Sequence, residues 1–486
     1  MQTFDPSAFA HLLALLGLVI LLASLASGAI ERLGVPTVAV FLAVGALLGP
    51  HGLGLIDYGL DSATLGAIAT LSLVLVLFTD SVTLNLAALR SHLRLTLVVL
   101  GPGTIIPALL TALAAWKLLG VSPAAAAILG AALASTDPVM VRGLLRLAEV
   151  PGAARIALGI ESGLNDVVLL PVVLLATVLL SAGGMPPMGQ VARVAGEVLL
   201  LGPLAGMVVG YLAVKAMGWF RGWFGMRRDY ESLYVLGVAF TAFAAADALH
   251  GSGFMAAFAA GLTIAATDVE LCDCFHEYGE ATAEMLLLLG FIAFGASLVW
   301  SGLTVLSGPT LLFALVALGA RPLVLYLALP RRGLDPVARR LIVWYGPRAL
   351  SSFLLVLIPV FAGVAGSERL FPVTALVVLL SVTLHGAMLV WATHWLKRRP
   401  ETVPAPSGAL PGAELVAHPE LITFEELDAL QRAGYAVHLL DVRTDKSWEA
   451  SDTMAAGALR LPPGRPVQSA AALALPRQDW LVAYCA

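Results

Sequence analysis

The chain has 486 residues, of which 59% are hydrophobic and only 12% are charged, with a net charge of −4. Soluble proteins average about 45–50% apolar and about a quarter charged residues, so this composition excludes an ordinary soluble globular protein for most of the chain. The three cysteines, Cys272, Cys274 and Cys485, do not make a disulfide framework.

Long apolar segments recur from Phe9 to Leu396, and each is near the ~20 residues that a helix needs to cross a bilayer. We therefore predict an all-α polytopic membrane protein with about thirteen transmembrane helices. The first segment lacks the positively charged start of a signal peptide, so we expect it to be a retained helix. The expected spans are 9–28, 35–50, 62–82, 95–116, 121–147, 155–181, 193–214, 231–249, 252–267, 281–300, 308–329, 340–363 and 370–396.

The loops between these spans differ sharply in positive charge. Loops that follow odd-numbered spans, together with the junction after the last span, carry 17 Lys and Arg residues. The remaining loops carry 3, namely Lys117, Arg193 and Arg369. Because Lys and Arg mark cytoplasmic loops, we predict a multi-pass protein of the bacterial inner (plasma) membrane with its N-terminus outside and its C-terminus in the cytoplasm.

Helix-breaking residues interrupt two of the spans at depth. The sequence STDP at 135–138 breaks the fifth span, and GPR at 346–348 breaks the twelfth. Proline removes a backbone hydrogen bond, and exposed backbone is tolerated in a membrane only inside protein or beside a watery cavity. Weakly similar segments, beginning at Gly101 and Ser307, precede the two breaks. Paired interruptions in related halves of a chain are typical of a transporter site.

The sixth span carries four polar residues in two neighbouring stripes. Glu161 and Asn165 are four residues apart and share a helix face, as do Ser162 and Asp166. An ionisable group inside a membrane costs roughly 2.5–3.5 kcal/mol, so these residues are functional candidates, with a purely structural helix–helix contact as the alternative. Further charges in or near the spans are Asp80, Asp137, Asp247, Glu284, Arg321 and Arg348.

Several motifs together resemble the cation:proton antiporter-1 family, the sodium/proton exchangers of bacteria and eukaryotes. They are VPTVAVFLAVGALLGP, STDPV, ESGLND, HGSGFMAAFAAGL and GPRAL, and the resemblance covers about residues 9–396. It implies thirteen helices with inverted repeats, two broken helices that cross, a homodimer, and a six-helix transport unit that moves against a dimer unit.

The resemblance also implies roles for individual residues. Asp166 of the Asn-Asp pair is expected to carry the ion or the proton, with Asn165 beside it. The Ser162 hydroxyl, the Asp137 carboxylate and the carbonyl of Thr136 are expected to complete an oxygen shell for an alkali cation.

A buried structural ion pair is expected between Glu161 and Arg348. Relatives often have Gly-Leu-Arg-Gly where this chain has Gly-Pro-Arg-Ala, so the resemblance leaves open the local backbone and the precise partner of Arg348.

These residues predict a secondary active antiporter, not an enzyme, that supports pH homeostasis by alternating access. A monovalent cation, Na⁺ first with K⁺ or Li⁺ as alternatives, and H⁺ are expected to compete for Asp166. Relatives with an Asn-Asp pair are expected to be electroneutral, so the resemblance implies through Asn165 that exchange is electroneutral here. We expect no cofactor, no metal beyond the transported cation and no nucleic acid partner. The open alternatives are an electrogenic antiporter, a K⁺-selective or redox- or sulfur-gated K⁺/H⁺ antiporter, and a membrane-anchored sulfurtransferase.

The composition changes after the last span. We divide the chain into a transmembrane domain at 1–399, a Pro/Gly-rich linker at 400–414 and a tail at 415–486. The tail resembles the start of a rhodanese-like (sulfurtransferase) domain through ITFEELDAL, LLDVR, GALRLP and LVAYC. The resemblance places an active-site loop after Cys485, but the chain stops at Ala486. We therefore expect a small, incomplete and non-catalytic α/β tail.

Overall fold

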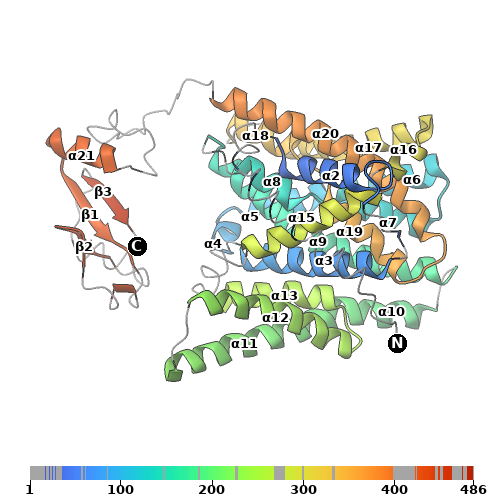
Figure 1. The fold of residues 1–486 in the computed structure, drawn as a ribbon, viewed down its shortest axis with the longest axis horizontal. Helices are drawn as coiled ribbons and strands as arrows, with labels where there is room; N and C mark the ends of the chain where they lie inside the picture. Colours follow the sequence, from blue (N-terminus) through green and yellow to red (C-terminus); the bar gives the residue numbers. More distant parts are fainter. Residues whose placement is uncertain are drawn as a thin grey trace. The chain divides into compact units, whose positions relative to one another are not determined.

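The computed structural model divides into two compact units, Met1–Arg398 and Arg399–Ala486, each of which is described by itself (Figure 1). The structure describes four isolated positions before residue 35, and residues 35–397 except for 56–58, 61, 85, 146, 148, 184–186, 225–227, 268–279, 298–299 and 331–333. In the second unit it describes 422, 424–443, 447–448, 453–461, 473 and 479–484. Cys272, Cys274 and Cys485 lie outside the described residues, as does nearly all of the predicted first span.

The described part of the first unit consists of helices and the segments that connect them. Its helices are α2 (Thr37–Leu48), α3 (Ala63–Val82), α4 (Leu86–Ser91), α5 (Leu93–Leu100), α6 (Pro102–Leu119), α7 (Pro123–Ala134), α8 (Pro138–Leu145), α9 (Gly152–Ser181), α10 (Met188–Gly196), α11 (Gly202–Phe224), α12 (Arg228–Ala248), α13 (Gly253–Thr267), α15 (Glu280–Ser297), α16 (Ser301–Thr304), α17 (Gly308–Ala328), α18 (Pro336–Trp344), α19 (Leu350–Phe361) and α20 (Leu370–Lys397). A short π-helix, Glu197–Leu201, joins α10 to α11.

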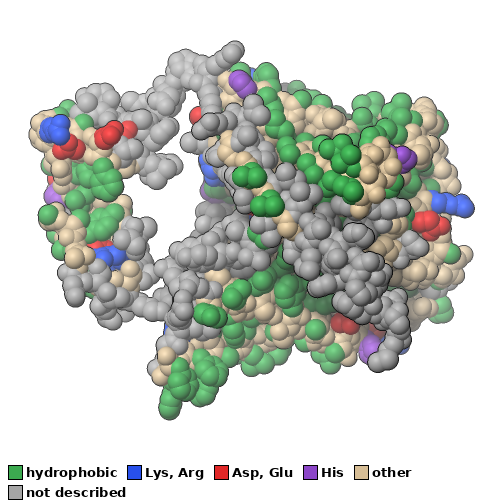
Figure 2. Space-filling model, in the orientation of Figure 1, with side chains coloured by type: hydrophobic (Ala, Val, Ile, Leu, Met, Phe, Trp, Pro, Cys, Tyr) green, Lys and Arg blue, Asp and Glu red, His purple; other side chains and the backbone are tan. Residues whose placement is uncertain are grey.

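Among the described residues, nine helical segments are long and apolar enough to cross a membrane, and α2, α13 and α19 are shorter apolar helices. Together they overlap every predicted span from 35–50 to 370–396. Large apolar side chains such as Leu109 and Leu315 point outward and are 64% and 69% exposed. Hydrophobic and neutral side chains dominate the described surface of this unit in Figure 2. Such a surface suits lipid rather than water, in agreement with the predicted polytopic membrane fold.

Side-chain caps and prolines set where several of these helices begin. Ser122 accepts a hydrogen bond from the Ala125 amide at the start of α7, and Asp335 accepts from the Ala338 amide at the start of α18. In each helix proline follows the cap, because its missing N–H is not needed in the first turn.

Both predicted breaks are present in the structure. The α7 helix ends at Ala134 and α8 begins at Pro138, while α18 ends at Trp344 and α19 begins at Leu350. The two non-helical segments, 135–137 and 345–349, meet: the Asp137 amide donates to the Pro347 carbonyl at 2.9 Å. We call these two segments the crossing.

The helices form two groups by their packing. In the first group α3 packs against α13 and α15, α2 against α15, and α11 and α12 against α13. In the second group α6 packs against α7 and α17, α9 against α7, and α19 against α7, α9 and α20. Figure 1 shows α11, α12 and α13 side by side beneath α3. The α11–α13 approach is so close that a Cβ on Gly206 would lie 2.0 Å from the Ala256 carbonyl oxygen.

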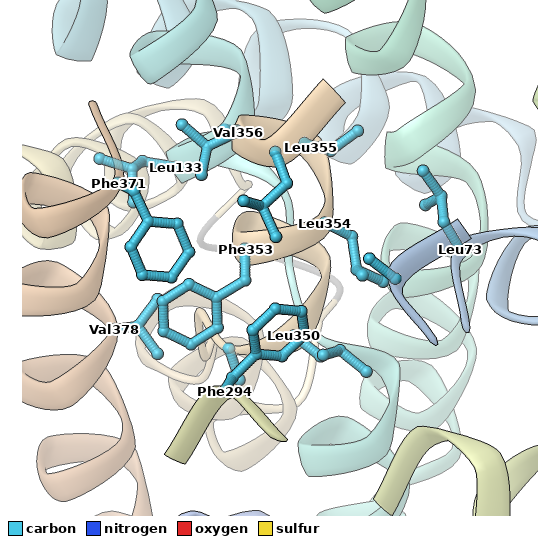
Figure 3. Close-up of a cluster of buried hydrophobic side chains, with 14 of the residues drawn as sticks. Leu73, Leu133, Phe294, Leu350, Phe353, Leu354, Leu355, Val356, Phe371 and Val378 are labelled. Carbon is cyan, nitrogen blue, oxygen red and sulfur yellow. The ribbon is translucent and has the colours of Figure 1, made fainter. Parts of the chain in front are cut away.

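An aromatic stack fills the core beside α19 (Figure 3). Phe353 of α19 stacks on Phe294 of α15 and on Phe371 of α20, with ring centroids 5.4 and 5.2 Å apart. All three rings are fully buried. This cluster packs the half-helix α19 between its neighbours and so holds the crossing in place.

The described part of the second unit is a small α/β structure. Strands β1 (Val437–Asp441), β2 (Leu459–Arg460) and β3 (Trp480–Tyr484) form a parallel sheet in the order β2-β1-β3. Helix α21 (Phe424–Arg432) contributes Leu430, which is buried with Trp480. The rhodanese-like identity of this unit stays a prediction.

Candidate functional site

The four polar residues predicted on the sixth span lie together inside the protein. Glu161, Ser162, Asn165 and Asp166 are all on α9 and are 0–6% exposed. Four polar side chains buried on one helix need partners. The crossing supplies them for Asn165 and Asp166, whereas Glu161 and Ser162 have partners elsewhere.

Two hydroxyl groups of the crossing bind the Asn-Asp pair. The Ser135 hydroxyl donates to Oδ1 of Asp166 at 2.5 Å. The Asn165 amide Nδ2 donates to Oγ1 of Thr136 at 2.7 Å. Ser135 is missing from the predicted site, although its place beside Thr136 in the STDP break is a signal that could have identified it.

The predicted site residue Asp137 makes backbone contacts. Its Oδ1 accepts from the Met140 amide and its Oδ2 from the Leu350 amide, both at 2.9 Å. One carboxylate therefore caps the N-termini of both half-helices, α8 and α19. The negative charge is placed where the partial positive charges of two helix ends converge.

Two buried arginines complement the opposite helix ends. Arg348, which is 1% exposed, donates through Nη1 to the carbonyl of Ala134, the last residue of α7. Arg321, also 1% exposed, donates through Nη1 to the Val343 carbonyl at 3.2 Å, near the end of α18. A cation at a helix C-terminus offsets the partial negative charge of the free carbonyl groups.

The prediction that Glu161 pairs with Arg348 is wrong, because Glu161 has a different partner. Glu161 pairs with Arg321 of α17, whose Nε and Nη2 each lie 2.5 Å from one carboxylate oxygen. The planar guanidinium matches a carboxylate in this two-point geometry. The Arg321 side chain lies so close to Gly346 that a Cβ on Gly346 would be 2.6 Å from Nη1 of Arg321. Arg348 instead reaches Ala134, as described above.

The other two predicted ligands, Ser162 and Thr136, each have a hydrogen-bond partner within the protein. The Ser162 hydroxyl donates to the Gly159 carbonyl at 3.3 Å, one turn earlier on α9. Thr136 lies at the site through its hydroxyl, which accepts from Asn165. The expected role of the Thr136 carbonyl as a ligand stays a prediction.

Two oxygens of the Asn-Asp pair have no hydrogen-bond partner within the part of the chain that the structure describes. They are Oδ2 of Asp166 and Oδ1 of Asn165, both fully enclosed. Buried polar atoms nearly always have partners, so an unpartnered one needs an explanation, such as a bound ion. Free oxygen acceptors on two consecutive residues suit a proton or a hard cation.

The comparisons with known proteins identify the family of the chain. Residues 17–395 match the family described as sodium/hydrogen exchanger, transmembrane. The K(+)/H(+) antiporter NhaP2 of Shewanella sp. (strain MR-4) is 28% identical over 76% of this chain and 64% of its own length. The K(+)/H(+) antiporter NhaP of Alkalimonas amylolytica is 26% identical over 84% of this chain and 70% of its own length. The chain thus spans only about two thirds of the length of these curated relatives.

Among solved structures, the sodium proton antiporter MjNhaP1 from Methanocaldococcus jannaschii at pH 8 shares the fold. The TM-score is 0.63 at 21% identity, and the match covers 78% of this chain and 99% of that one. Because the family match extends over most of the chain, this protein belongs to the sodium/hydrogen exchanger family of membrane proteins.

Proposed function

We propose that this protein is a secondary active antiporter in which a monovalent cation and a proton compete for Asp166. The observation that carries the proposal is the unpartnered Oδ2 of Asp166, held inside the protein beside a break in two helices. Ser135 occupies Oδ1, so it orients the carboxylate and leaves Oδ2 for the transported species. A proton or a cation at that oxygen neutralises the same charge, which makes binding mutually exclusive.

The surrounding groups divide into ligands and supports. Asn165 would offer its amide oxygen to the cation, while its Nδ2 stays bound to Thr136. We place Ser162 at the edge of the site, where its hydroxyl can exchange the Gly159 carbonyl for the ion. Asp137 keeps its hydrogen bonds to two backbone amides in this scheme and supports the site as the cap of both half-helices.

Alternating access would follow from movement of the second helix group, which holds the whole crossing, against the first. The buried pair of Glu161 and Arg321 would travel with that group as a rigid support. Only Asp166 would change its bound species, so one cation would exchange for one proton and the cycle would be electroneutral. The protein would then regulate cytoplasmic pH as a homodimer, with its N-terminus outside.

The names of the similar proteins point to two different cations. The curated relatives named above are K(+)/H(+) antiporters by their names, whereas MjNhaP1 is a sodium proton antiporter. We propose K⁺ and Na⁺ as the candidate substrates, with Li⁺ as a third. The alternative of a membrane-anchored sulfurtransferase loses support, because the family match covers residues 17–395.

The test is proton movement in proteoliposomes that contain the purified protein and a pH-sensitive dye. We expect the wild-type protein to release a preset pH gradient when Na⁺ or K⁺ is added, and D166N to be inactive. Thr177→Ala is the matched control, because Thr177 lies on the same helix, is buried and, among the described residues, bonds to the Val173 carbonyl of its own helix at 2.7 Å. Exchange by D166N at the wild-type rate would disprove the role of Asp166.

A further inference from the structure

A hollow of about 280 Å³ opens beside the crossing on the side where α3 and α8 end. Three helices line it: α3 through Asp80, α8 through Pro138 and Arg142, and α9 through Arg155 and Ser162. Pro138 and Ser162 are both part of this lining and are buried. Pro138 directly follows Asp137 and Ser162 lies one turn before Asp166 on α9, so the hollow adjoins the candidate site.

Asp80 and Arg142 meet across this hollow from different helix groups. Asp80 is near the end of α3, in the first group, whereas Arg142 is on α8, in the second. Nη2 of Arg142 lies 3.9 Å from Oδ1 of Asp80, and the side chains are 24% and 10% exposed. The α9 backbone also approaches here, since a Cβ on Gly163 would be 3.5 Å from the Asp80 carbonyl oxygen.

The geometry of this pair differs from that of a structural ion pair in the same protein. Two hydrogen bonds of 2.5 Å each join Arg321 to Glu161, and both side chains are fully buried. The contact between Nη2 of Arg142 and Oδ1 of Asp80 is longer, and the Arg142 side chain is partly exposed. It lacks the two-point geometry that fixes Arg321 to Glu161.

The charge balance of the hollow gives a reason for a carboxylate at the position of Asp80. Its lining carries two guanidinium groups, Arg142 and Arg155, and one carboxylate, Asp80. Arg155 is fixed at the end of α8, where it donates to the carbonyls of Leu145 and Leu147. A cation that approaches the site through the hollow therefore passes two positive charges. Among the described residues of the lining, Asp80 is the carboxylate that offsets them.

We propose that Asp80 is the residue that makes this route passable to the transported cation, and that Arg142 serves as a tethered cation which the incoming ion displaces from Asp80. The proposal rests on the proposed antiport function and adds an electrostatic entry step to it. Because Asp80 and Arg142 belong to different helix groups, the same contact would open when the groups move apart.

The experiment compares D80N, R142Q and the double variant D80N/R142Q with the wild type in proteoliposomes, over a range of Na⁺ and of K⁺ concentrations. We expect D80N to raise the half-saturating cation concentration roughly tenfold, with the maximal rate changed by less than about twofold. Added choline chloride should shrink the difference, because salt screens charges in an open hollow. R142Q should lower the half-saturating concentration, and the double variant should return toward the wild-type value.

Glu197→Gln is the matched control. Glu197 pairs with Arg193 at 2.7 Å and is 26% exposed, but it does not line the hollow. It should leave the half-saturating concentration unchanged. If D80N does not assemble in the membrane, R142Q alone tests the proposal. An R142Q variant whose half-saturating cation concentration is unchanged or raised would overturn it.

The two proposals fail in different ways. A wild-type protein that moves no protons in response to any alkali cation would remove the antiport function itself. An active wild type with a D80N variant of equal half-saturating concentration, or one impaired only in maximal rate, would remove the role of Asp80 and leave the antiport function standing.

Discussion

Asp137 accepts a hydrogen bond from the backbone amide of Leu350, 213 residues later in the chain, at a distance of 2.9 Å. The same carboxylate accepts from the Met140 amide through its other oxygen. A single side chain therefore joins the first turns of two half-helices that come from different halves of the sequence. This contact makes the crossing one unit, so its parts are expected to move together.

Replacing Asp137 by Ala should destabilise the protein, because two helix caps are lost at about 0.5–2 kcal/mol each. Asp137→Asn keeps one acceptor oxygen and should fall between D137A and the wild type. The measurement is the unfolding temperature of purified protein in detergent. Ser181→Ala, at the exposed end of α9, is the control and should leave the temperature unchanged. Equal unfolding temperatures for D137A and the wild type would contradict the double cap.

The buried pair of Glu161 and Arg321 predicts a specific pattern of coupling. E161Q and R321Q should each cost ~3–5 kcal/mol, because either change leaves a buried charge without its partner. E161Q/R321Q should cost much less than the sum of the two. The control is E161Q/R348Q, whose members contact different groups and should be closer to additive. A double-mutant cycle on unfolding temperatures in detergent would contradict the structure if the coupling were larger with Arg348.

Local signals explain which features could be predicted from the sequence. Hydropathy gives the spans from residue 35 onward, and Pro138 and Pro347 give the two breaks, because each acts on its own segment of backbone. The spacing of Glu161 and Asn165 gives a shared helix face. None of these inferences needs a contact between distant parts of the chain.

The features that the sequence did not predict all depend on such contacts. Arg321 is 160 residues from Glu161, and no spacing rule connects them. Asp137 was expected among the ion's ligands, and its role as a cap for α19 becomes visible only when α19 is placed beside α8. A charged side chain in a span indicates that a partner exists, but tertiary packing chooses the partner.

The close approach of α11 and α13 predicts different effects for two glycines of α11. Gly206→Ala would put a Cβ 2.0 Å from the Ala256 carbonyl oxygen, so the helices must separate, at a cost of roughly 1–3 kcal/mol. Gly218→Ala meets nothing within 4 Å and is the matched control, expected to be neutral or slightly stabilising. Unfolding temperatures in detergent measure both. A variant G206A as stable as G218A would contradict the packing.

The tail contains a carboxylate whose ionisation should affect its stability. The side chain of Arg443, 2.6 Å from Asp441, holds the pKa of that carboxyl at about 2, below the ordinary value of about 3.9. A lowered pKa in the folded state stabilises it above about pH 4, and this contribution disappears as the pH falls through about 2. We expect the amides of β1 to lose protection from hydrogen exchange over that range in the full chain. The variant D441N should lack this step, and the same step in D441N would contradict the assignment.

Asn165 is the residue whose replacement tests the stoichiometry of exchange. In the structure its Nδ2 donates to Oγ1 of Thr136 at 2.7 Å, and its Oδ1 lies free of hydrogen bonds to the described residues. Asn165→Asp keeps the shape, but it adds a second carboxylate beside Asp166 and lets Thr136 donate instead of accept. The site could then carry one more proton per cycle.

We therefore expect the wild-type exchange rate to be independent of membrane potential and the N165D rate to depend on it. The measurement is proton release in proteoliposomes, with the potential followed by a voltage-sensitive dye. Asn165→Ala is the control, because it removes the amide without adding charge, and its remaining exchange should stay independent of the potential. If N165D exchanges ions at a rate that ignores the potential, the added carboxylate does not titrate during transport and the residue at position 165 does not set the stoichiometry. If the wild-type rate already depends on the potential, a second group besides Asp166 changes its charge in each cycle.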